Sequence, residues 1–572
     1  MRSLFIACAV AGACLTTAAR APAQVLDTAR AEVPAEMAVR AAERWNRPAE
    51  IRQAEDLEIA PGEEVHGSVA VREGWVTVGG TVHGDVVVLN GNVTLRSGSR
   101  VDGDVIVVGG FVEGAERGSV GGTVTSHAGT MRYRLEEERV VVEGVEEVTS
   151  RDNWLRRWRR RHQLNSSRIL ISAGTYNRVE GLPINVGGAL RQNFGWGRVS
   201  ADALGIFRSL ERFEWNDQNL GYSLSAEVQY GKLDALAAGV RMYEVVDGSE
   251  RWQLRDAEVG LASFFFRRDF RDYYEREGAT GYLTLRDGSR ATFTIAYGNE
   301  HWGTRSSGDP FSLFRNGESW RPNPVMDEGR FRLTTATLTY DTRNDRARPR
   351  SGWLLSGEVE HGESDRVFLG PTSPVARPAG VGAVDLEYTR VFFDLRRYNR
   401  LSPTRQLNAR LVLGGWVDGD QLPLQRRFSL GGPGTIPGYD FRRTESGEAD
   451  VLQCSDGPQL PGRPGQCERM VLAQLEYRAD FRLPFGNRGD LREFGFHRSP
   501  AWVVFVDAGR GWLVGPGRVG DLQFTNGSLP PLETFKLDAG TGFDLGLIGV
   551  FVAKAVGDSD SPNFFVRLRH RF

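Results

Sequence analysis

From about residue 166 to the end of the chain, apolar and polar residues alternate in segments separated by turns rich in Gly, Asp, Asn and Pro. The clearest segment is 473–483, where six apolar residues alternate with five charged or amide residues, and 384–389 and 407–413 repeat the pattern. Successive side chains of a strand point to opposite faces. The pattern therefore predicts about sixteen strands, each with one apolar and one polar face.

Two architectures share this alternation: a soluble β-sandwich or propeller, and a transmembrane β-barrel. Long strands with aromatic residues on the apolar face and charges on the other favour the barrel, whose strands cross a membrane in about 9–11 residues. An even number of strands lets the first and last strands pair antiparallel and close the sheet. We expect an all-β protein in which residues 166–572 form this barrel.

The final segment, NFFVRLRHRF (563–572), predicts the closing strand. An outward, lipid-facing set is expected at Phe564, Val566, Leu568 and Phe572, with Phe572 at the membrane boundary. The other face is expected to turn Phe565, Arg567, Arg569 and Arg571 toward the interior of the barrel, the lumen. His570 would then be a polar exception on the lipid-facing side.

A repeat precedes the barrel. HGSVAV, HGDVVV, DGDVIV and GGTVTS begin at 66, 83, 102 and 121, and each carries a Gly followed two residues later by a Val. Such a short period predicts a β-helix over 60–128, whose coils bury apolar residues against their neighbours. The rungs resemble the bactofilin-type polymer-forming β-helix, which implies a stacking or scaffolding module. His66, His83, Asp85, Asp102 and Asp104 recur at the turns, where corner residues are favoured over a metal ladder.

The remaining segments have simpler interpretations. Residues 1–23 read as a secretory signal peptide ending in an A-x-A site, residues 24–59 as an N-terminal linker and 129–165 as a charged linker. Trp154 and Trp158 among arginines offer an alternative for the last of these, a segment lying on a membrane surface. After export, Cys454 and Cys467 are expected to form a disulfide.

Charge and motif content exclude several function classes. With 71 basic and 73 acidic residues the net charge is −2, which argues against a nucleic-acid partner. The sequence contains no nucleophile elbow, zinc-protease helix, Walker loop or dinucleotide fingerprint. We expect no catalytic, cofactor-binding or metal residues, although a catalytic barrel stays open because a triad assembles in space.

Three stretches resemble a known family. TLTYDTRNDRARPRSGWLLSGEVEHG (337–362) is similar to the strand–turn–strand unit of the bacterial surface antigen superfamily, which includes the BamA- and TamA-like barrels. FVDAGRGW (505–512) and LDAGTGFDLG (537–546) follow in the order of that superfamily. The matching residues are Asp341, Arg343, Asp345, Pro349, Gly352, Asp507 and Gly509.

A further match is SLGGPGTIPGYDFRR (429–443). In the superfamily a loop here folds into the lumen and carries an aliphatic residue, an arginine, a glycine and an aromatic residue. The corresponding loop residues are Gly431, Gly432, Ile436, Pro437, Gly438 and Tyr439. Because Pro437 stands where the family has its arginine, the resemblance leaves the contact with acidic wall residues in doubt; Arg442 or Arg443 are candidate replacements.

The resemblance implies a protein of the bacterial outer membrane that assists insertion or translocation of polypeptides through weak pairing of the first and last strands. The family's βααββ polypeptide-transport-associated domains are not evident, and the β-helix occupies their place. The alternative is therefore a structural anchor or pore that tethers the β-helix. The expected partners are outer-membrane lipid and, through the β-helix, periplasmic or envelope proteins.

Overall fold

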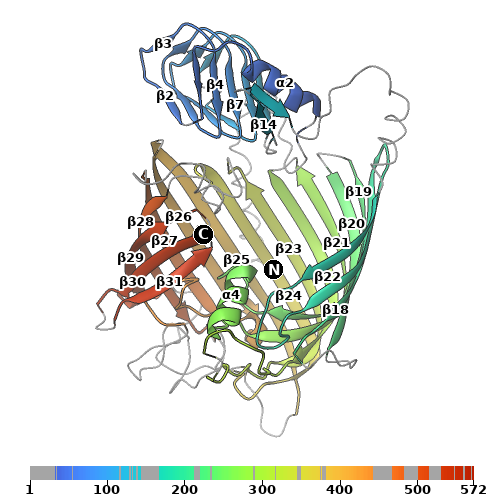
Figure 1. The fold of residues 1–572 in the computed structure, drawn as a ribbon. Coiled ribbons are helices and arrows are strands. Elements are labelled where there is room, and N and C mark those ends of the chain that lie inside the picture. Colours follow the sequence, from blue (N-terminus) through green and yellow to red (C-terminus); the bar gives the residue numbers. More distant parts are fainter. Residues whose placement is uncertain are drawn as a thin grey trace. The chain divides into compact units, whose positions relative to one another are not determined.

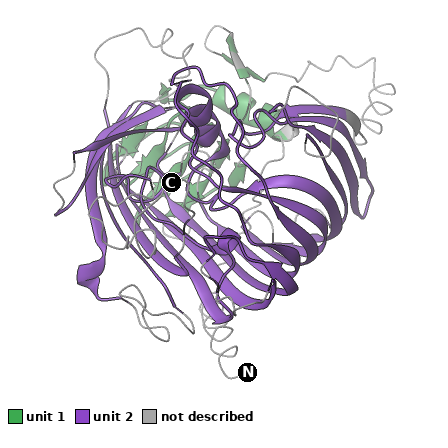
Figure 2. Cartoon of the chain, turned by 90° about the horizontal axis from the view of Figure 1, so that it is seen from below, with its two compact units in different colours: residues 1–148 green, residues 149–572 purple. Residues whose placement is uncertain are grey.

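The computed structural model describes residues 33–142 and 166–572. Within those limits it leaves out residues 34, 55, 115–117, 128–130, 132, 137–138, 211–218, 232–234, 288–289, 316, 344–348, 374, 376–381, 403, 442–464, 466, 482–499, 515–529, 547, 558–560 and 569. The chain divides into two compact units, residues 1–148 and 149–572, which are coloured separately in Figure 2. Each unit is described by itself.

The first unit contains a β-helix of short parallel strands in three sheets. The strands are β1 (Ile51–Gln53), β2 (Leu57–Ile59), β3 (Glu64–Val65), β4 (Val69–Arg72), β5 (Val76–Val78), β6 (Thr81–Val82), β7 (Val86–Leu89), β8 (Val93–Leu95), β9 (Arg100–Val101), β10 (Val105–Val108), β11 (Val112–Glu113), β12 (Ser119–Val120) and β13 (Val124–His127). One sheet runs β1-β4-β7-β10-β13, and the others run β2-β5-β8-β11 and β3-β6-β9-β12.

The repeat sets the register of the coils. Val86 pairs with Val69 on one side and with Val105 on the other, and Val105 pairs with Val124, so the valines that follow each Gly stack in a column. The interior contains fully buried valines from all three sheets because each coil covers the next. The predicted β-helix is confirmed, although its first strand begins at Ile51, inside the segment expected to be a linker.

Two further elements cover one sheet of the β-helix. Helix α2 (Ala35–Trp45) and the hairpin of β14 (Tyr133–Glu136) and β15 (Arg139–Val142) pack against the outer side chains of β4, β7 and β10. Trp45 is buried there, and the amide of Asn46 bonds both the backbone N–H and C=O of Val140. Structure therefore extends into both segments that the sequence suggested as linkers.

The second unit is one antiparallel sheet of sixteen strands, as predicted (Figure 1). Its strands are β16 (Ser166–Ala173), β17 (Ile184–Asn193), β18 (Gly197–Phe207), β19 (Leu220–Tyr230), β20 (Ala235–Gly248), β21 (Tyr273–Asp287), β22 (Ala291–Thr304), β23 (Glu328–Asp341), β24 (Gly352–Phe368), β25 (Val384–Ser402), β26 (Arg405–Gly419), β27 (Arg469–Asp480), β28 (Ala501–Trp512), β29 (Lys536–Asp544), β30 (Ile548–Ala555) and β31 (Asn563–Leu568). In Figure 2 these strands are seen from below and curve round an interior.

Strand order equals sequence order, so each pair is joined by one connection, and the connections at the two ends of the sheet differ in length. Short turns such as 194–196 and 403–404 lie at one end. Long loops lie at the other, including 249–272 with helix α4 (Asp256–Phe266) and 420–468 with the short helix η1 (Leu424–Arg426). The short helix η2 (Leu532–Thr534) also belongs to this end. Outer-membrane barrels place their short turns in the periplasm and their long loops outside the cell.

The faces of the sheet carry the predicted polarity. Leu283, Tyr297 and Leu338 are half exposed on the outside, whereas Glu300, Asp394 and Arg410 are buried inside. The inside is partly filled by loop 420–441, and a cavity of about 1050 Å³ remains beside it. No helix among the described residues combines the length and apolarity needed to cross a membrane.

Candidate functional site: the seam between β16 and β31

The sheet does not close by strand pairing in the part of the chain that the structure describes. Strand β16 pairs with β17 and strand β31 pairs with β30, but no pairing joins β16 to β31. We call the space between these two edge strands the seam. The expectation that the last strand pairs along its length with the first is therefore wrong for the described residues.

The exposure of the outward side chains also marks the seam. Ile169 of β16 is 83% exposed and Phe564 of β31 is 78% exposed, whereas Leu283 within the sheet is 57% exposed. A neighbouring strand covers part of each outward side chain inside a sheet, and an edge strand lacks that neighbour on one side. Each of the two edge strands thus carries exposed apolar side chains where the sheet is interrupted.

Helix α4 lies at the seam, between β31 and the strands that follow β16 (Figure 1). Glu258 on this helix is paired with Arg567 of β31 at 2.7 Å, and both side chains are buried. The Glu258 carboxylate also accepts a bond from the backbone N–H of Leu568 at 2.8 Å, and the Arg255 guanidinium donates to the carbonyl of Leu568 at 3.2 Å. Side chains next to and on a helix therefore satisfy the backbone groups that a neighbouring strand would bind.

Local chemistry explains why a helix forms in this loop. The backbone N–H of Arg255 donates to Glu258 three residues later at 3.0 Å, a bond of the kind found in a capping box. At the other end, Arg267 has a left-handed backbone with φ of 58°, and its N–H bonds the carbonyl of Ser263. Glu258 thus stabilises the first turn of the helix and also contacts β31.

The helix is apolar on nearly all sides after Glu258 (VGLASFFF), which is unusual next to a polar lumen. Leu261 and Phe266 are about half exposed. A helix without a polar face is normally buried in protein or faces lipid. We conclude that α4 provides apolar surface where the sheet is interrupted.

On the side of β16, the same helix packs closely against the residues that directly follow this strand. A Cβ on Gly260 would lie 3.4 Å from the backbone nitrogen of Tyr176, just after β16, so the two backbones come close together. The rings of Tyr176 and Phe264 meet edge to face at 5.5 Å. The backbone N–H groups of Leu313 and Phe314, in the loop after β22, bond the carbonyls of Phe264 and Phe265 at the end of α4.

A buried ion pair strengthens this side. Arg178, in the loop between β16 and β17, is fully buried and pairs with Asp269 and Asp272, each at 3.1 Å. Both aspartates lie in the segment that leaves α4, and Arg178 also donates to the carbonyl of Arg271 at 2.6 Å. Charges taken out of water need such partners. The α4 segment is therefore bound much more extensively to the β16 side than to β31.

The predicted lumen loop is inside the barrel, where Ile436 is fully buried. The N–H of Gly432 bonds the carbonyl of Tyr439 at 2.9 Å, which folds the motif into a compact turn. The N–H of Gly438 donates to Asp538 of β29 at 2.5 Å, and a Cβ at Gly509 would lie 2.7 Å from Ile436. Gly431 and Gly432 have positive φ, as glycine allows.

The position of Pro437 raised the question of which cation replaces the family's arginine. Arg571 contacts Asp507 of β28, and both side chains are almost fully buried. Asp507 pairs in register with Asp538, the residue that holds Gly438. Arg442 and Arg443, the candidates from the sequence, lie outside the described residues. A residue after the last strand thus provides the charge at this wall.

The C-terminal residues differ from the expected pattern. Phe564 and Val566 face outward as predicted, but β31 ends at Leu568. Phe572 is buried, and its carbonyl accepts a bond from Tyr398 at 3.3 Å, so the expectation that it lies at the membrane boundary is wrong. His570 is also not on the lipid side, because its Nδ1 lies 3.0 Å from Asp544 inside the barrel. The strand ends early because its final residues bind the inner wall.

The other predicted family residues form a turn at the short-turn end. Arg343 donates to both oxygens of Asp341 at 2.9 and 2.8 Å, and the carbonyl of Pro349 accepts from Gln406 at 2.8 Å. Gly352 has φ of 104°, and a Cβ there would lie 2.2 Å from a backbone oxygen. These residues shape a turn away from the seam. Asp345 lies outside the described residues.

The predicted disulfide cannot be placed, because Cys454 lies outside the described residues. The other cysteine, Cys467, is fully buried, and its backbone forms an isolated antiparallel β-bridge with Phe428. The bridge holds the two ends of loop 420–468 together. The Cys454–Cys467 disulfide stays a prediction.

Sequence reasoning missed the residues that define the seam: Arg178, Arg255, Glu258, Asp269 and Asp272. The stretch DAEVGLASFFF carried a usable signal, because an apolar run without strand alternation is unusual inside a barrel loop. The ion pairs had no such signal, since Arg178 and Asp272 are 94 residues apart and Glu258 and Arg567 are 309 apart.

An antiparallel sheet of sixteen strands with an apolar outer face, a polar interior and a loop folded inside is typical of one class, the transmembrane β-barrels of the bacterial outer membrane. A family model described as the Omp85 superfamily domain matches residues 218–546, more than half of the chain. The chain belongs to the Omp85 superfamily. Its barrel therefore resides in the bacterial outer membrane, in contact with lipid.

The solved structures that match this chain are distant in sequence. BamA from Haemophilus ducreyi lacking POTRA domains 1–3 is 14% identical with a TM-score of 0.42, and the match covers 70% of each chain. CdiB from Acinetobacter baumannii is 11% identical with a TM-score of 0.29, covering 77% of this chain and 65% of its own. No curated protein matches the sequence. Superfamily members are generally transport and assembly proteins.

Proposed function

We propose that the barrel inserts or translocates polypeptides at the seam, and that α4 leaves β31 when a client segment enters. One observation carries the proposal: the backbone N–H and C=O of Leu568 are bound by Glu258 and Arg255 and not by a strand. A client strand offers the same donors and acceptors and can replace these side chains. Family membership supports a role in polypeptide handling.

The geometry of β31 supports pairing with a client. Backbone groups in an antiparallel pair alternate between the two neighbours, so residues two apart point their N–H and C=O the same way. Leu568 turns these groups away from β30 and toward α4. Val566 and Phe564 follow the same alternation, which gives three residues with the backbone orientation that a client strand needs.

The unequal contacts of α4 indicate where the seam opens. On the β16 side, Arg178 is buried between two aspartates. The ring contact of Tyr176 with Phe264 and two backbone bonds from the loop after β22 add to it. On the β31 side, the pairing rests on Glu258 and Arg255. The separation with fewer bonds to break lies between α4 and β31. We infer that α4 moves together with β16.

Depletion of the protein tests the role. We expect the amounts of several other outer-membrane barrels to fall, as measured by quantitative mass spectrometry of membranes. Complementation with the unaltered chain should restore these amounts. Complementation with the Glu258→Arg variant should restore them only in part, because the new cation lies beside Arg567 and forces the contact apart. Unchanged amounts of every other barrel after depletion would contradict an assembly role.

A second function is favoured by one observation. The described part of the first unit contains a β-helix with its covering helix and hairpin, and shows none of the βααββ modules expected for client reception. We infer as the alternative that the barrel anchors the β-helix to the membrane. Deletion of residues 60–128 that alters cell-envelope shape but leaves other barrels at normal amounts would support the anchor, and loss of those barrels would oppose it.

A further inference from the structure

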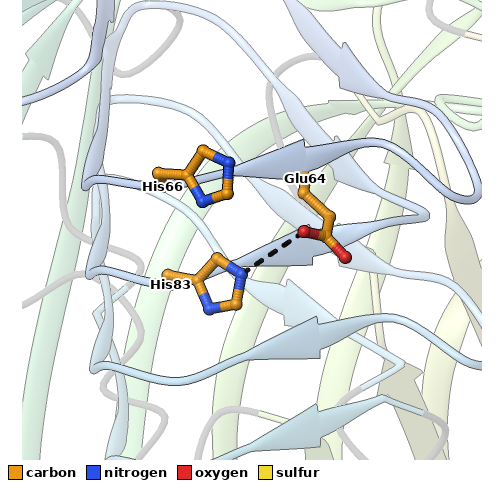
Figure 3. A group of neighbouring side chains, drawn as sticks. All are labelled: Glu64, His66 and His83. Carbon is orange, nitrogen blue, oxygen red and sulfur yellow. Dashed lines mark ion pairs between the residues drawn. The ribbon is translucent and has the colours of Figure 1, made fainter.

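Three side chains of the first unit form a group on the surface of the β-helix: Glu64, His66 and His83 (Figure 3). One ligand atom from each residue lies within 4.8 Å of the others, and all three residues are exposed. Neither the family membership nor the seam involves this group. Sequence reasoning had treated these histidines as corner residues of the coils.

The repeat brings the two histidines together. Val65 pairs in parallel with Val82, so His66 and His83, the next residue on each coil, stack one above the other. Their rings lie 5.4 Å apart with only 5° between the planes. Figure 3 shows one nitrogen of each ring on the side of the Glu64 carboxylate. The paired strands hold the backbone of both coils, so the positions do not depend on a mobile loop.

A fourth residue orients His83. The next coil places Asp102 below it, and Asp102 Oδ2 lies 2.8 Å from His83 Nδ1. An ionised carboxylate accepts the Nδ1 proton, so the lone pair of His83 lies on Nε2, the nitrogen facing Glu64. A carboxylate behind an imidazole is the common arrangement behind metal-bound histidines.

The distance between His83 and Glu64 leaves room for an ion between them. His83 Nε2 and Glu64 Oε2 are 3.8 Å apart, which is longer than a hydrogen bond. Zinc bonds to nitrogen and oxygen are about 2.0–2.2 Å long, so two tetrahedral ligands lie about 3.4 Å apart. The Glu64–His83 pair is thus within a few tenths of an ångström of that separation. The ligand atoms of the whole group lie within 4.8 Å of one another, so these exposed side chains would move by about 1 Å to admit the ion.

We propose that Glu64, His66 and His83 bind a zinc ion or a similar late first-row divalent cation, with Asp102 as a positioning residue. Two imidazoles and one carboxylate form a donor set that zinc accepts, and they leave a fourth position for water or another ligand. The ion would link the first two coils through their side chains.

Titration of the tag-free, full-length protein in detergent with Zn²⁺ tests the site by calorimetry. We expect His83→Ala and His66→Ala to remove one binding event. Asp102→Asn should weaken that event by about tenfold or more while keeping the stoichiometry, as loss of an orienting partner does. Co²⁺ should give the visible absorption of a tetrahedral site in the unaltered protein and not in His83→Ala.

Two controls make the result specific. His301 is exposed on β22, and His301→Ala should leave the titration unchanged. His361, Glu363 and Glu387 form a second group with similar spacing, so His361→Ala separates any ion bound there. The proposal fails if His66→Ala and His83→Ala both bind Zn²⁺ as the unaltered protein does, or if His361→Ala alone removes all binding. Neither outcome of the zinc titration bears on the proposal for the seam.

Discussion

The two sides of helix α4 differ in kind. Toward β16 the helix segment is held by a buried arginine between two aspartates, by edge-to-face rings and by backbone bonds to a neighbouring loop. Toward β31 it is held by side chains that take the place of strand partners. The difference shows that one helix can fill an unpaired seam with two kinds of contact, a buried ion pair toward one edge and side chains bound to strand backbone toward the other.

Strand β31 has its own attachments, and they do not involve α4. Its first residue, Asn563, donates to the carbonyls of Pro437 and Gly438 in the lumen loop. The residues after the strand bind the inner wall through Arg571 and Asp507. The lumen loop and the wall would therefore hold β31 in place during the proposed departure of α4.

Arg178→Ala should have the largest effect. It leaves Asp269 without its buried arginine and removes one of two arginines at Asp272, which also pairs with Arg321. Loss of one partner of a buried pair costs about 3–5 kcal/mol. We expect the folded band on unboiled gels to disappear at a clearly lower temperature. Arg330→Ala, at an exposed position on β23, is the control and should change little.

Arg571→Ala should follow, at about 3 kcal/mol, because it leaves Asp507 buried beside Asp538 with no contact from the C-terminal tail. Phe572, the next residue, should lose its position near Tyr398, and protease should then remove the C-terminal residues faster. Arg571→Lys keeps the charge and should be milder. Equal protection of the tail in the alanine variant and the unaltered chain would show that this contact does not hold it.

Glu258→Ala also removes one partner of a buried ion pair, together with the capping bond at the start of α4, so we expect a cost of about 3 kcal/mol. Its functional effect should be the most specific. With the helix released from Leu568, the protein in planar lipid bilayers should show a higher ion conductance or more frequent opening events. Glu258→Gln retains an acceptor for the backbone N–H, so its conductance should lie between that of the unaltered protein and that of Glu258→Ala. A conductance equal to that of the unaltered protein in both variants would mean that this contact does not close the seam.

Much of the fold followed from local patterns. Alternating polarity predicted the sixteen strands because period two is imposed by the backbone. The Gly and Val repeat predicted the β-helix because each coil repeats the same contacts. The position of Pro437 identified a missing charge. Local patterns did not identify the contact between Arg571 and Asp507, since 64 residues separate them.

The seam illustrates why the rest could not be predicted. Phe572 continues the apolar period of the last strand, yet it turns inward because Arg571 finds Asp507 and Tyr398 binds the terminal carbonyl. Closure by β16 and β31 was expected from an even strand count. Whether two edges pair depends on what competes for them, and here a helix from a loop does so. Such competition involves residues about 310 positions apart, which a single sequence does not relate.

Thiol crosslinking of α4 to each side of the seam tests the central claim most directly. In a chain with Cys454 and Cys467 replaced by Ser, one variant carries cysteines at Glu258 and Arg567, and a matched variant carries them at Gly260 and Thr175. The same short, reducible crosslinker is used for both, and assembly of other outer-membrane barrels is measured before and after reduction. We predict that the link between α4 and β31 blocks assembly until it is reduced, while the link between α4 and the β16 side leaves assembly intact. Blockage by the second link, or normal assembly with the first link fully formed, would contradict the account.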